Sequence, residues 1–228
     1  MKDKIVLVTG ANGGLGSSVT QAFLDAGAIV IGASRNIRQS EFDSATFTAI
    51  SADLSSGQGA RELIEELLSK FGRLDVLAYT VGGFAGGSAI ADTDDPTFQN
   101  MFDVNLYSTF YLLRAAIPAL RQSQAGRVIA IGSRAAVDPG ANAGAYSASK
   151  AAMVSLIRTV ALENQDVGMT ANIILPGTID TAANRKAMPK ADFSKWVQPK
   201  SIASLMVWLA SEAGKDVNGA AIPVYGSA

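Results

Sequence analysis

The chain contains no cysteine and no histidine. Their absence removes thiolate nucleophiles, the commonest general base and most zinc-ligand sets, so we expect no metal site. Disulfides are excluded too, which fits a reducing, cytoplasmic compartment. The reactive side chains that remain are tyrosine, lysine, serine and the carboxylates.

Long apolar runs and an excess of charge are also missing. The apolar run at residues 5–8 is strand-length, well short of the ~18 residues of a spanning helix. With 19 basic and 20 acidic residues the net charge is -1, without the basic excess of a nucleic-acid binder. We therefore expect neither membrane nor nucleic acid as a partner. No linker-like stretch divides the 228 residues, which predicts one domain, 1–228.

The N-terminal segment reads as strand, glycine-rich loop and helix. Residues 4–9 form a buried strand in this prediction, and a helical pattern follows the loop as far as Gly27. Such a loop can bind a pyrophosphate, because the backbone turns sharply and the free N–H groups of the helix face the anion. The spacing departs from the usual dinucleotide fingerprint, so a glycine turn without a ligand is the alternative. The candidate cofactor-binding residues here are Gly10, Asn12, Gly14, Leu15 and Gly16.

Two further strands are expected, at residues 28–33 and 46–51. The first of them ends at Ser34 and Arg35, where an NAD-binding fold would present an acid to the ribose hydroxyls. Arg35 can pair with a 2′-phosphate, which favours NADP, with NAD possible; a solvated surface charge is the alternative. Asp53 follows the other strand where adenine is expected, or else caps the next helix.

A fourth strand, residues 74–80, leads into a loop with four glycines at 82–87. Loops at the carboxyl ends of strands bind ligands in open α/β sheets. Phe84 at the centre of this loop either covers a substrate or plugs the loop onto the core.

The second half of the chain continues the alternation. Long helices are expected at 97–121 and 144–163, and both are apolar enough to form a subunit interface. Asn105 lies in the first of them, as a satisfied structural amide or as part of a water network. Strands are predicted at 127–132, 169–175 and 221–225 and a helix at 201–210, with the irregular stretch 181–200 as a substrate lid.

Tyr146 and Lys150 carry chemistry that few other residues here offer. In a helix they lie at i and i+4, on one face. A tyrosine titrates near ~10, so about 3 units, roughly 4 kcal/mol, must come from its surroundings before it transfers protons well at neutral pH. A charge about 4 Å away at an effective dielectric of about 20 supplies that amount. We therefore expect Lys150 to lower the pKa of Tyr146, although the spacing alone can arise by chance.

Six motifs follow one another in a fixed order: Thr9-Gly10-x-x-x-Gly14-x-Gly16, Ala52-Asp53-Leu54, Asn105, Ser133, Tyr146-x-x-x-Lys150 and Pro176-Gly177-x-x-x-Thr181. In this order the chain resembles the short-chain dehydrogenase/reductase family along nearly its whole length. The resemblance implies a doubly wound α/β Rossmann fold, with a seven-stranded, mostly parallel sheet and helices on both faces. It also implies an NAD(P)-dependent oxidoreductase acting on a small carbonyl or alcohol substrate, as a homotetramer or homodimer.

The same resemblance implies roles for the catalytic residues. Tyr146 is the general acid or base, and Lys150 lowers its pKa and holds the nicotinamide ribose. Ser133 hydrogen-bonds the substrate oxygen, and Asn105 holds a water in the proton relay.

The remaining cofactor residues also follow from the resemblance: Leu54 beside Asp53, then Pro176, Gly177, Ile179 and Thr181, with Thr181 and the backbone near Ile179 orienting the carboxamide. The alternative for Ser133 and Thr181 is an ordinary structural role, in which the side chain stabilises a turn or caps a helix. One departure from the family is residues 79–82, Tyr-Thr-Val-Gly, where Asn-Asn-Ala-Gly is usual after the fourth strand.

A narrower resemblance, at residues 82–87 and 180–196, is to the dihydropteridine reductase branch. That branch is marked by an acid after the second strand and lacks the catalytic Ser and Asn, whereas this chain has Arg35, Ser133 and Asn105. The sequence therefore favours a general carbonyl reductase. The alternatives are a dihydropteridine reductase-like enzyme and, in another class, a non-catalytic module that senses dinucleotide.

Overall fold

The computed structural model describes residues 1–123 and 125–227, so the last residue of the expected domain 1–228 lies outside the described residues. Its centre is a seven-stranded sheet in the order β3-β2-β1-β4-β5-β6-β7, in which every neighbouring pair is parallel. This topology confirms the predicted doubly wound α/β fold. The strands are β1 (Ile5–Thr9), β2 (Ile29–Ser34), β3 (Phe47–Ser51), β4 (Val76–Tyr79), β5 (Arg127–Ile131), β6 (Thr170–Pro176) and β7 (Ala221–Val224).

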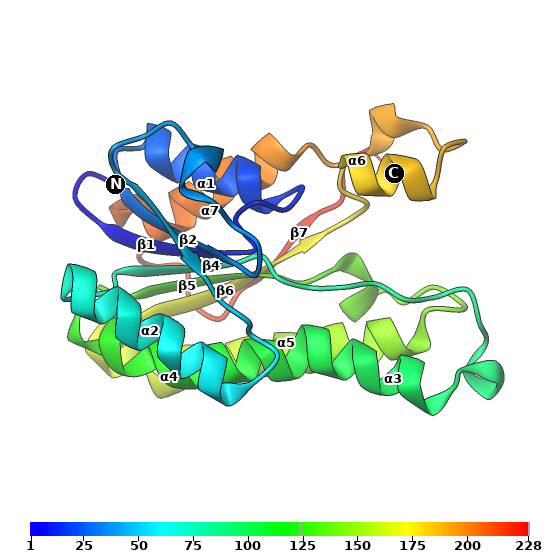
Figure 1. Cartoon of the computed structure of the whole chain (residues 1–228). Helices are drawn as coiled ribbons and strands as arrows, with labels where there is room; N and C mark the ends of the chain where they lie inside the picture. The colour runs from blue at the N-terminus through cyan, green and yellow to red at the C-terminus, as the bar shows by residue number, and fades with distance from the viewer. Residues whose placement is uncertain (124, 228) are drawn as a thin grey trace.

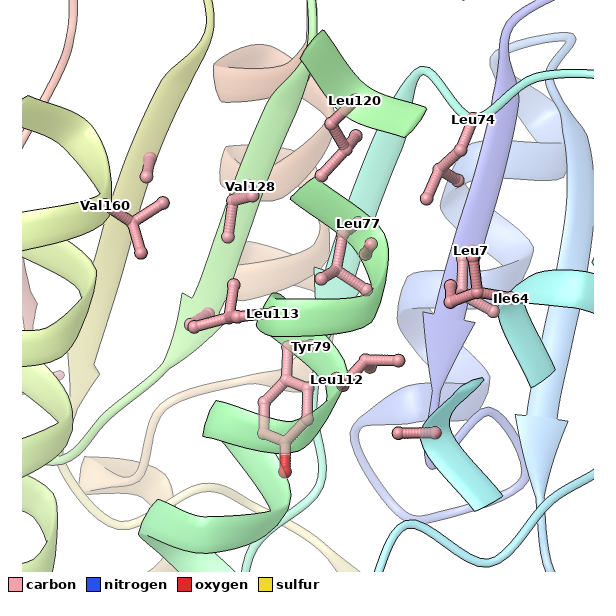
Figure 2. Packing of buried hydrophobic residues seen from close by; sticks show 14 of the residues in the cluster. Leu7, Ile64, Leu74, Leu77, Tyr79, Leu112, Leu113, Leu120, Val128 and Val160 are labelled. Atoms are coloured by element: carbon pink, nitrogen blue, oxygen red, sulfur yellow. The ribbon is translucent and has the colours of Figure 1, made fainter. Parts of the chain in front are cut away.

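Helices cover both faces of the sheet (Figure 1). Helices α1 and α7 lie on one face and α2, α4 and α5 on the other. The helices are α1 (Gly16–Asp25), α2 (Gly57–Phe71), α3 (Asp95–Phe102), α4 (Ser108–Gln122), α5 (Gly144–Glu163), α6 (Ala182–Ala187) and α7 (Pro199–Ala210). Each layer buries its own apolar cluster, and Figure 2 shows Leu77 and Tyr79 of β4 packing against Leu112 and Leu113 of α4.

The winding of the sheet reverses between β1 and β4. Open α/β sheets bind ligands outside the carboxyl ends of the strands at such a point. Thr9 and Tyr79, the last residues of these strands, are register partners. The glycine loop after β1 and the glycine-rich loop after β4 therefore start side by side.

Thr80 braces the two strands. Its hydroxyl donates to the Thr9 carbonyl at 2.6 Å, and its N–H donates to the Thr9 hydroxyl at 3.2 Å. These bonds replace the regular ladder, so β4 ends at Tyr79, one residue before the end of the predicted strand 74–80. It also begins at Val76, two residues after the predicted start. The unusual sequence at 79–82 thus keeps the central strands tied together.

The prediction of one long helix at 97–121 is wrong about where the helix begins and about its continuity. It begins earlier, at Asp95, because the Asp94 carboxylate accepts a hydrogen bond from the Thr97 N–H at 2.7 Å and so caps it. It is also not a single α-helix, since a π-helical segment, Asp103–Tyr107, separates α3 from α4. That segment contains Asn105, and π-helical insertions are frequent at functional sites.

The segment between β6 and α7 consists of short pieces. Helix α6 is followed by a 3₁₀ turn, Phe193–Lys195, and an isolated bridge joins Ile179 to Val197. Asp180 holds this segment together, accepting hydrogen bonds from Arg185 and from Gln198. Within residues 1–123 and 125–227, no helix has the length and apolar character that crossing a membrane requires.

Candidate active site

The glycine loop between β1 and α1 is shaped by close backbone approaches. Gly10 has a φ of +64°, and a Cβ added to Gly16 would lie 1.9 Å from the Gly10 carbonyl oxygen. No residue but glycine fits at 16, and the loop therefore curls tightly onto the N-terminus of α1. Free N–H groups at such a terminus attract phosphate.

A cavity of about 520 Å³ opens along this loop. Its volume lies in the range of ~300–1,000 Å³ that small-molecule and cofactor sites have. It is lined by residues that follow β1, β2, β3 and β4, and by residues of the α3–α4 region. The residues predicted from the sequence that line it are Gly10, Asn12, Gly14, Leu15, Gly16, Ser34, Arg35, Asp53 and Leu54. The backbone cradle, the helix terminus and this extended lining fit a dinucleotide.

The far end of the cavity is formed by Ser34, Arg35 and Asp53. The Ser51 hydroxyl donates to the Arg35 carbonyl at 2.8 Å and fixes the backbone there. Asp53 does not cap α2, because the Ser56 side chain accepts the Gly59 N–H at 3.1 Å and performs that role. The capping alternative for Asp53 is therefore wrong, and its carboxylate accepts the N–H of the nearby Ser55 at 3.1 Å.

Asn12 joins the glycine loop to the segment after β2. Its amide donates to the Asn36 carbonyl and to the Glu41 carboxylate, both at 3.4 Å. This places Asn12 at the rim, where it positions the loop that carries Arg35.

Pro176, Gly177, Ile179 and Thr181 lie beside the cavity and do not line it. Gly177 donates its N–H to Val224 at 2.9 Å, so β6 and β7 stay paired to that point. The Thr181 side chain accepts the Asn184 N–H at 3.2 Å and caps α6. Thr181 also reaches the glycine loop, since a Cβ added to Gly14 would lie 3.0 Å from its side chain.

Tyr146 lies in the first turn of α5, with Ser133 close by after β5. Burial raises the pKa of the Tyr146 phenol, and a hydrogen bond with the Ser133 side chain offsets part of that rise. Ser133 also accepts the N–H of Ala135 at 3.1 Å, so it caps the short turn after β5. The Ser133 hydroxyl therefore both caps the turn and hydrogen-bonds the Tyr146 phenol.

Lys150 is buried one turn further along α5. Its ammonium donates to the Ile131 carbonyl at 3.0 Å, and burial lowers its pKa to about 8. The sequence predicts that Lys150 lowers the pKa of Tyr146, whereas in this structure burial of the phenol dominates and raises it. A phenol with a raised pKa keeps its proton at neutral pH, which is the form that donates.

The Asn105 side chain is fully satisfied. Its oxygen accepts the Gly83 N–H at 3.0 Å, and its amide donates to the Gly83 carbonyl and to the Ser149 hydroxyl, both at 3.1 Å. Asn105 and Lys150 meet at Gly82, where an added Cβ would lie 3.0 Å from the amide oxygen and 3.0 Å from the ammonium nitrogen. Gly82 lines the cavity, so the Asn105 and Lys150 side chains lie against one of its walls, although neither of them lines it, nor do Ser133 and Tyr146.

Several residues that line the cavity were not predicted from the sequence. Asp103, Val104 and Ser108 project from the π-helical segment and the start of α4, and Thr80 follows β4. A polar side chain in a mostly apolar helix is the sequence signal for Asp103 and Ser108, as it is for Asn105, whereas the apolar Val104 gives no such signal.

Comparison with known proteins agrees with this geometry. The profile of the family described as short chain dehydrogenase matches residues 4–192. A 3-oxoacyl-[acyl-carrier-protein] reductase of rhamnolipid biosynthesis from Pseudomonas aeruginosa is 34% identical, over 98% of this chain and 95% of its own. L-fucose dehydrogenase of Mus musculus is 30% identical, over 92% of this chain and 83% of its own. The Pseudomonas aeruginosa RhlG/NADP active-site complex superposes with a TM-score of 0.90 at 31% identity, covering 99% of this chain and 96% of that one.

The chain belongs to the short-chain dehydrogenase family. It is an NAD(P)-dependent oxidoreductase. These relatives are named as a reductase and a dehydrogenase of other substrates, and they lend no support to a dihydropteridine reductase or to a sensing module.

Proposed function

We propose that this enzyme interconverts a carbonyl compound and its alcohol, with Tyr146 as the proton donor or acceptor and NADP as the preferred cofactor. One observation carries the proposal: the Lys150 ammonium meets Gly82, which lines the glycine-rich cavity, and Tyr146, one turn before Lys150 on α5, has the Ser133 side chain as its hydrogen-bond partner. The bound dinucleotide supplies a hydride in reduction and accepts one in oxidation. The dinucleotide would be held by residues of the cavity lining: Gly10, Asn12, Gly14, Leu15, Gly16, Asp53 and Leu54. The nicotinamide end would lie at Pro176, Gly177, Ile179 and Thr181.

The protein residues manage the proton. The Tyr146 phenol donates its proton to the oxygen of a bound carbonyl in reduction. A phenol is protonated at neutral pH already, and burial raises the pKa of this one further. The Ser133 hydroxyl hydrogen-bonds the same oxygen and holds it in line with the phenol. Lys150 provides a positive charge that favours the phenolate left behind, and it holds the nicotinamide ribose.

Asn105 contributes to the proton relay through its position. Its side chain bonds both the N–H and the carbonyl of Gly83. Its backbone carbonyl accepts the Thr109 hydroxyl at 2.6 Å. We propose that Asn105 holds a water near Lys150, through which Tyr146 is reprotonated from solvent.

The preference for NADP is based on Arg35. Within the described residues, 1–123 and 125–227, no carboxylate forms an ion pair with it, so its guanidinium is available to a 2′-phosphate. The NADP complex of the structural relative supports the same choice. The named relatives include a 3-oxoacyl reductase and a sugar dehydrogenase, which supports a carbonyl or alcohol substrate.

We further propose that residues 1–228 work as one domain in which 181–200 covers the substrate. The bonds from Arg185 and Gln198 to Asp180 support a folded cover, and they hold the pKa of Asp180 at about 2. Exposed Tyr107 and Phe110 support assembly into a homodimer or homotetramer. The lack of cysteine supports the reducing cytoplasm as its compartment.

The test is Tyr146→Phe, which removes only the phenol oxygen. General acid catalysis contributes about 10²- to 10⁴-fold, so we expect kcat to fall at least a hundredfold with NADPH and a panel of ketones. Tyr111→Phe is the matched control, because Tyr111 lies on α4 away from the cavity lining, and it should keep full activity. Full turnover by Tyr146→Phe contradicts the mechanism, and faster consumption of NADH than NADPH by the wild type contradicts the cofactor preference.

A further inference from the structure

Phe84 is an apolar side chain in an unusual place. It is 70% exposed, yet its ring packs edge-on against that of Tyr146, with the centroids 5.0 Å apart and an interplanar angle of 77°. It does not plug the loop onto the core. A single exposed apolar residue needs no explanation, but this one touches the ring of the proposed proton donor.

The loop that carries Phe84 is held firmly on its N-terminal side. Asn105 binds both the N–H and the carbonyl of Gly83. The N–H of Ala85 donates to the sulfur of Met101 at 3.2 Å. Both residues that flank Phe84 are therefore tied to the α3 region.

The loop is held on its C-terminal side as well. Gly87 donates its N–H to the Asn142 carbonyl at 2.7 Å, and Asn142 lies just before α5. The ring thus has a defined position before any substrate arrives, and its exposed face is preorganised for contact.

Other exposed apolar side chains lie in the same region. Four exposed large hydrophobic side chains lie in the loops after β4 and β5 and in the segment after α6: Phe84, Ile90, Val137 and Met188, here called the apolar rim. Ile90 reaches the start of α5, since a Cβ added to Gly144 would lie 2.1 Å from it. Figure 1 shows the segment after β4, the segment before α5 and α6 at one end of the molecule.

Charge does not compete with this apolar character beside Ser133. Arg134, which follows it, forms an ion pair with Asp138 at 2.8 Å. Each of these two charges therefore has an opposite charge next to it.

We propose that Phe84 is a specificity-determining residue. Its exposed face binds an apolar group, aryl or alkyl, next to the carbonyl of the substrate, and the enzyme prefers such substrates over polyhydroxylated ones. The inference rests on the proposed function, because a substrate oxygen that reaches the Tyr146 phenol must bring its neighbouring group to the Phe84 ring. A contact with an apolar pocket is worth roughly tenfold or more in discrimination.

The experiment compares two methyl ketones, acetophenone and hydroxyacetone, with NADPH. We expect the wild type to prefer acetophenone, and Phe84→Ala to reduce that preference about tenfold, mainly through the KM for acetophenone. Phe84→Leu should keep part of the preference. Phe98→Ala is the matched control: Phe98 is also an exposed ring packed on a second aromatic, but its partner is Phe102, whereas the partner of Phe84 is Tyr146. Equal losses on both ketones, or an unchanged ratio, would overturn the inference.

A binding measurement separates this inference from the proposed function. Acetophenone is titrated by calorimetry into wild type and Phe84→Ala, each with oxidised NADP present, so that no turnover is needed. Weaker binding to the variant supports the role of Phe84 even if the wild type reduces neither ketone. Equal binding to the two proteins, or no binding to the wild type, overturns it.

Discussion

At the scale of single residues, Lys150 shows a conflict between stability and chemistry. Its buried ammonium donates to the Ile131 carbonyl at 3.0 Å and to the Met153 sulfur at 3.9 Å, and no carboxylate pairs with it among the described residues. A pKa lowered from 10.5 to about 8 corresponds to a cost of about 3 kcal/mol for keeping the charge. The site therefore holds a charge that the fold alone would not favour.

Lys150→Met is expected to abolish activity and to stabilise the protein near pH 7. The gain is about 1–2 kcal/mol, because the lost hydrogen bond to Ile131 offsets part of the relieved cost. Between about pH 8 and 10.5 the unfolded chain holds a proton on Lys150 that the native protein has released, so wild-type stability rises with pH there. The advantage of the variant is therefore full below pH 8 and fades towards pH 10.5.

Urea unfolding of both proteins at pH 7 and pH 10 measures this difference directly. The other titrating groups are shared by the two proteins, so they cancel to first order. A stability difference that stays constant between the two pH values would show that burial of the charge is not its source.

At the scale of elements, the apolar runs and the residues that bound them were enough to predict the strands. The apolar runs of β1, β2, β5 and β6 are bounded by glycine or by polar residues, and their predicted ends lie within one residue of the observed ones. The π-helical segment, Asp103–Tyr107, was not predictable in this way. One extra residue in a helix that is apolar on most faces leaves no break in the pattern.

The π-helical segment has a testable role in holding the loop of Phe84. Asn105→Ala leaves the N–H and the carbonyl of Gly83 without their partner, so we expect a loss of about 2 kcal/mol in stability and faster exchange of the Gly83 amide hydrogen. Asn105→Asp keeps the acceptor and loses the donor, and should fall between wild type and Asn105→Ala.

Asn218→Ala is the control for this test. Asn218 also bridges two backbone groups, the Ala171 N–H and the Ala161 carbonyl. Its loss should cost similar stability and leave exchange at Gly83 unchanged. If Asn105→Ala leaves Gly83 protected as in the wild type, the proposed support of the loop is wrong.

At the scale of the whole molecule, the order of the strands brings the site together. Residues from 10 to 181 meet at one edge because β1 and β4 are neighbours and every strand points the same way. The ordered motifs allowed this arrangement to be predicted from the sequence. Contacts such as the ring of Phe84 on Tyr146 were out of reach, because loop conformation depends on bonds between segments far apart in the chain.

The oligomeric state also belongs to the scale of the whole molecule, because it depends on the exposed surface of α4. On the outer surface of α4 and the segment before it, Tyr107 and Phe110 are 41% and 40% exposed, and the Arg114 guanidinium lies 5.1 Å from the centroid of the Phe110 ring. If this surface joins two subunits, Phe110→Glu places an unpaired carboxylate in an apolar contact, which costs several kcal/mol. We expect light scattering to give an oligomer for the wild type and a smaller species for Phe110→Glu. Val167→Glu, a change at an exposed apolar residue beyond the end of α5, should keep the wild-type mass. A monomeric wild type, or a Phe110→Glu variant of unchanged mass, would contradict assembly through α4.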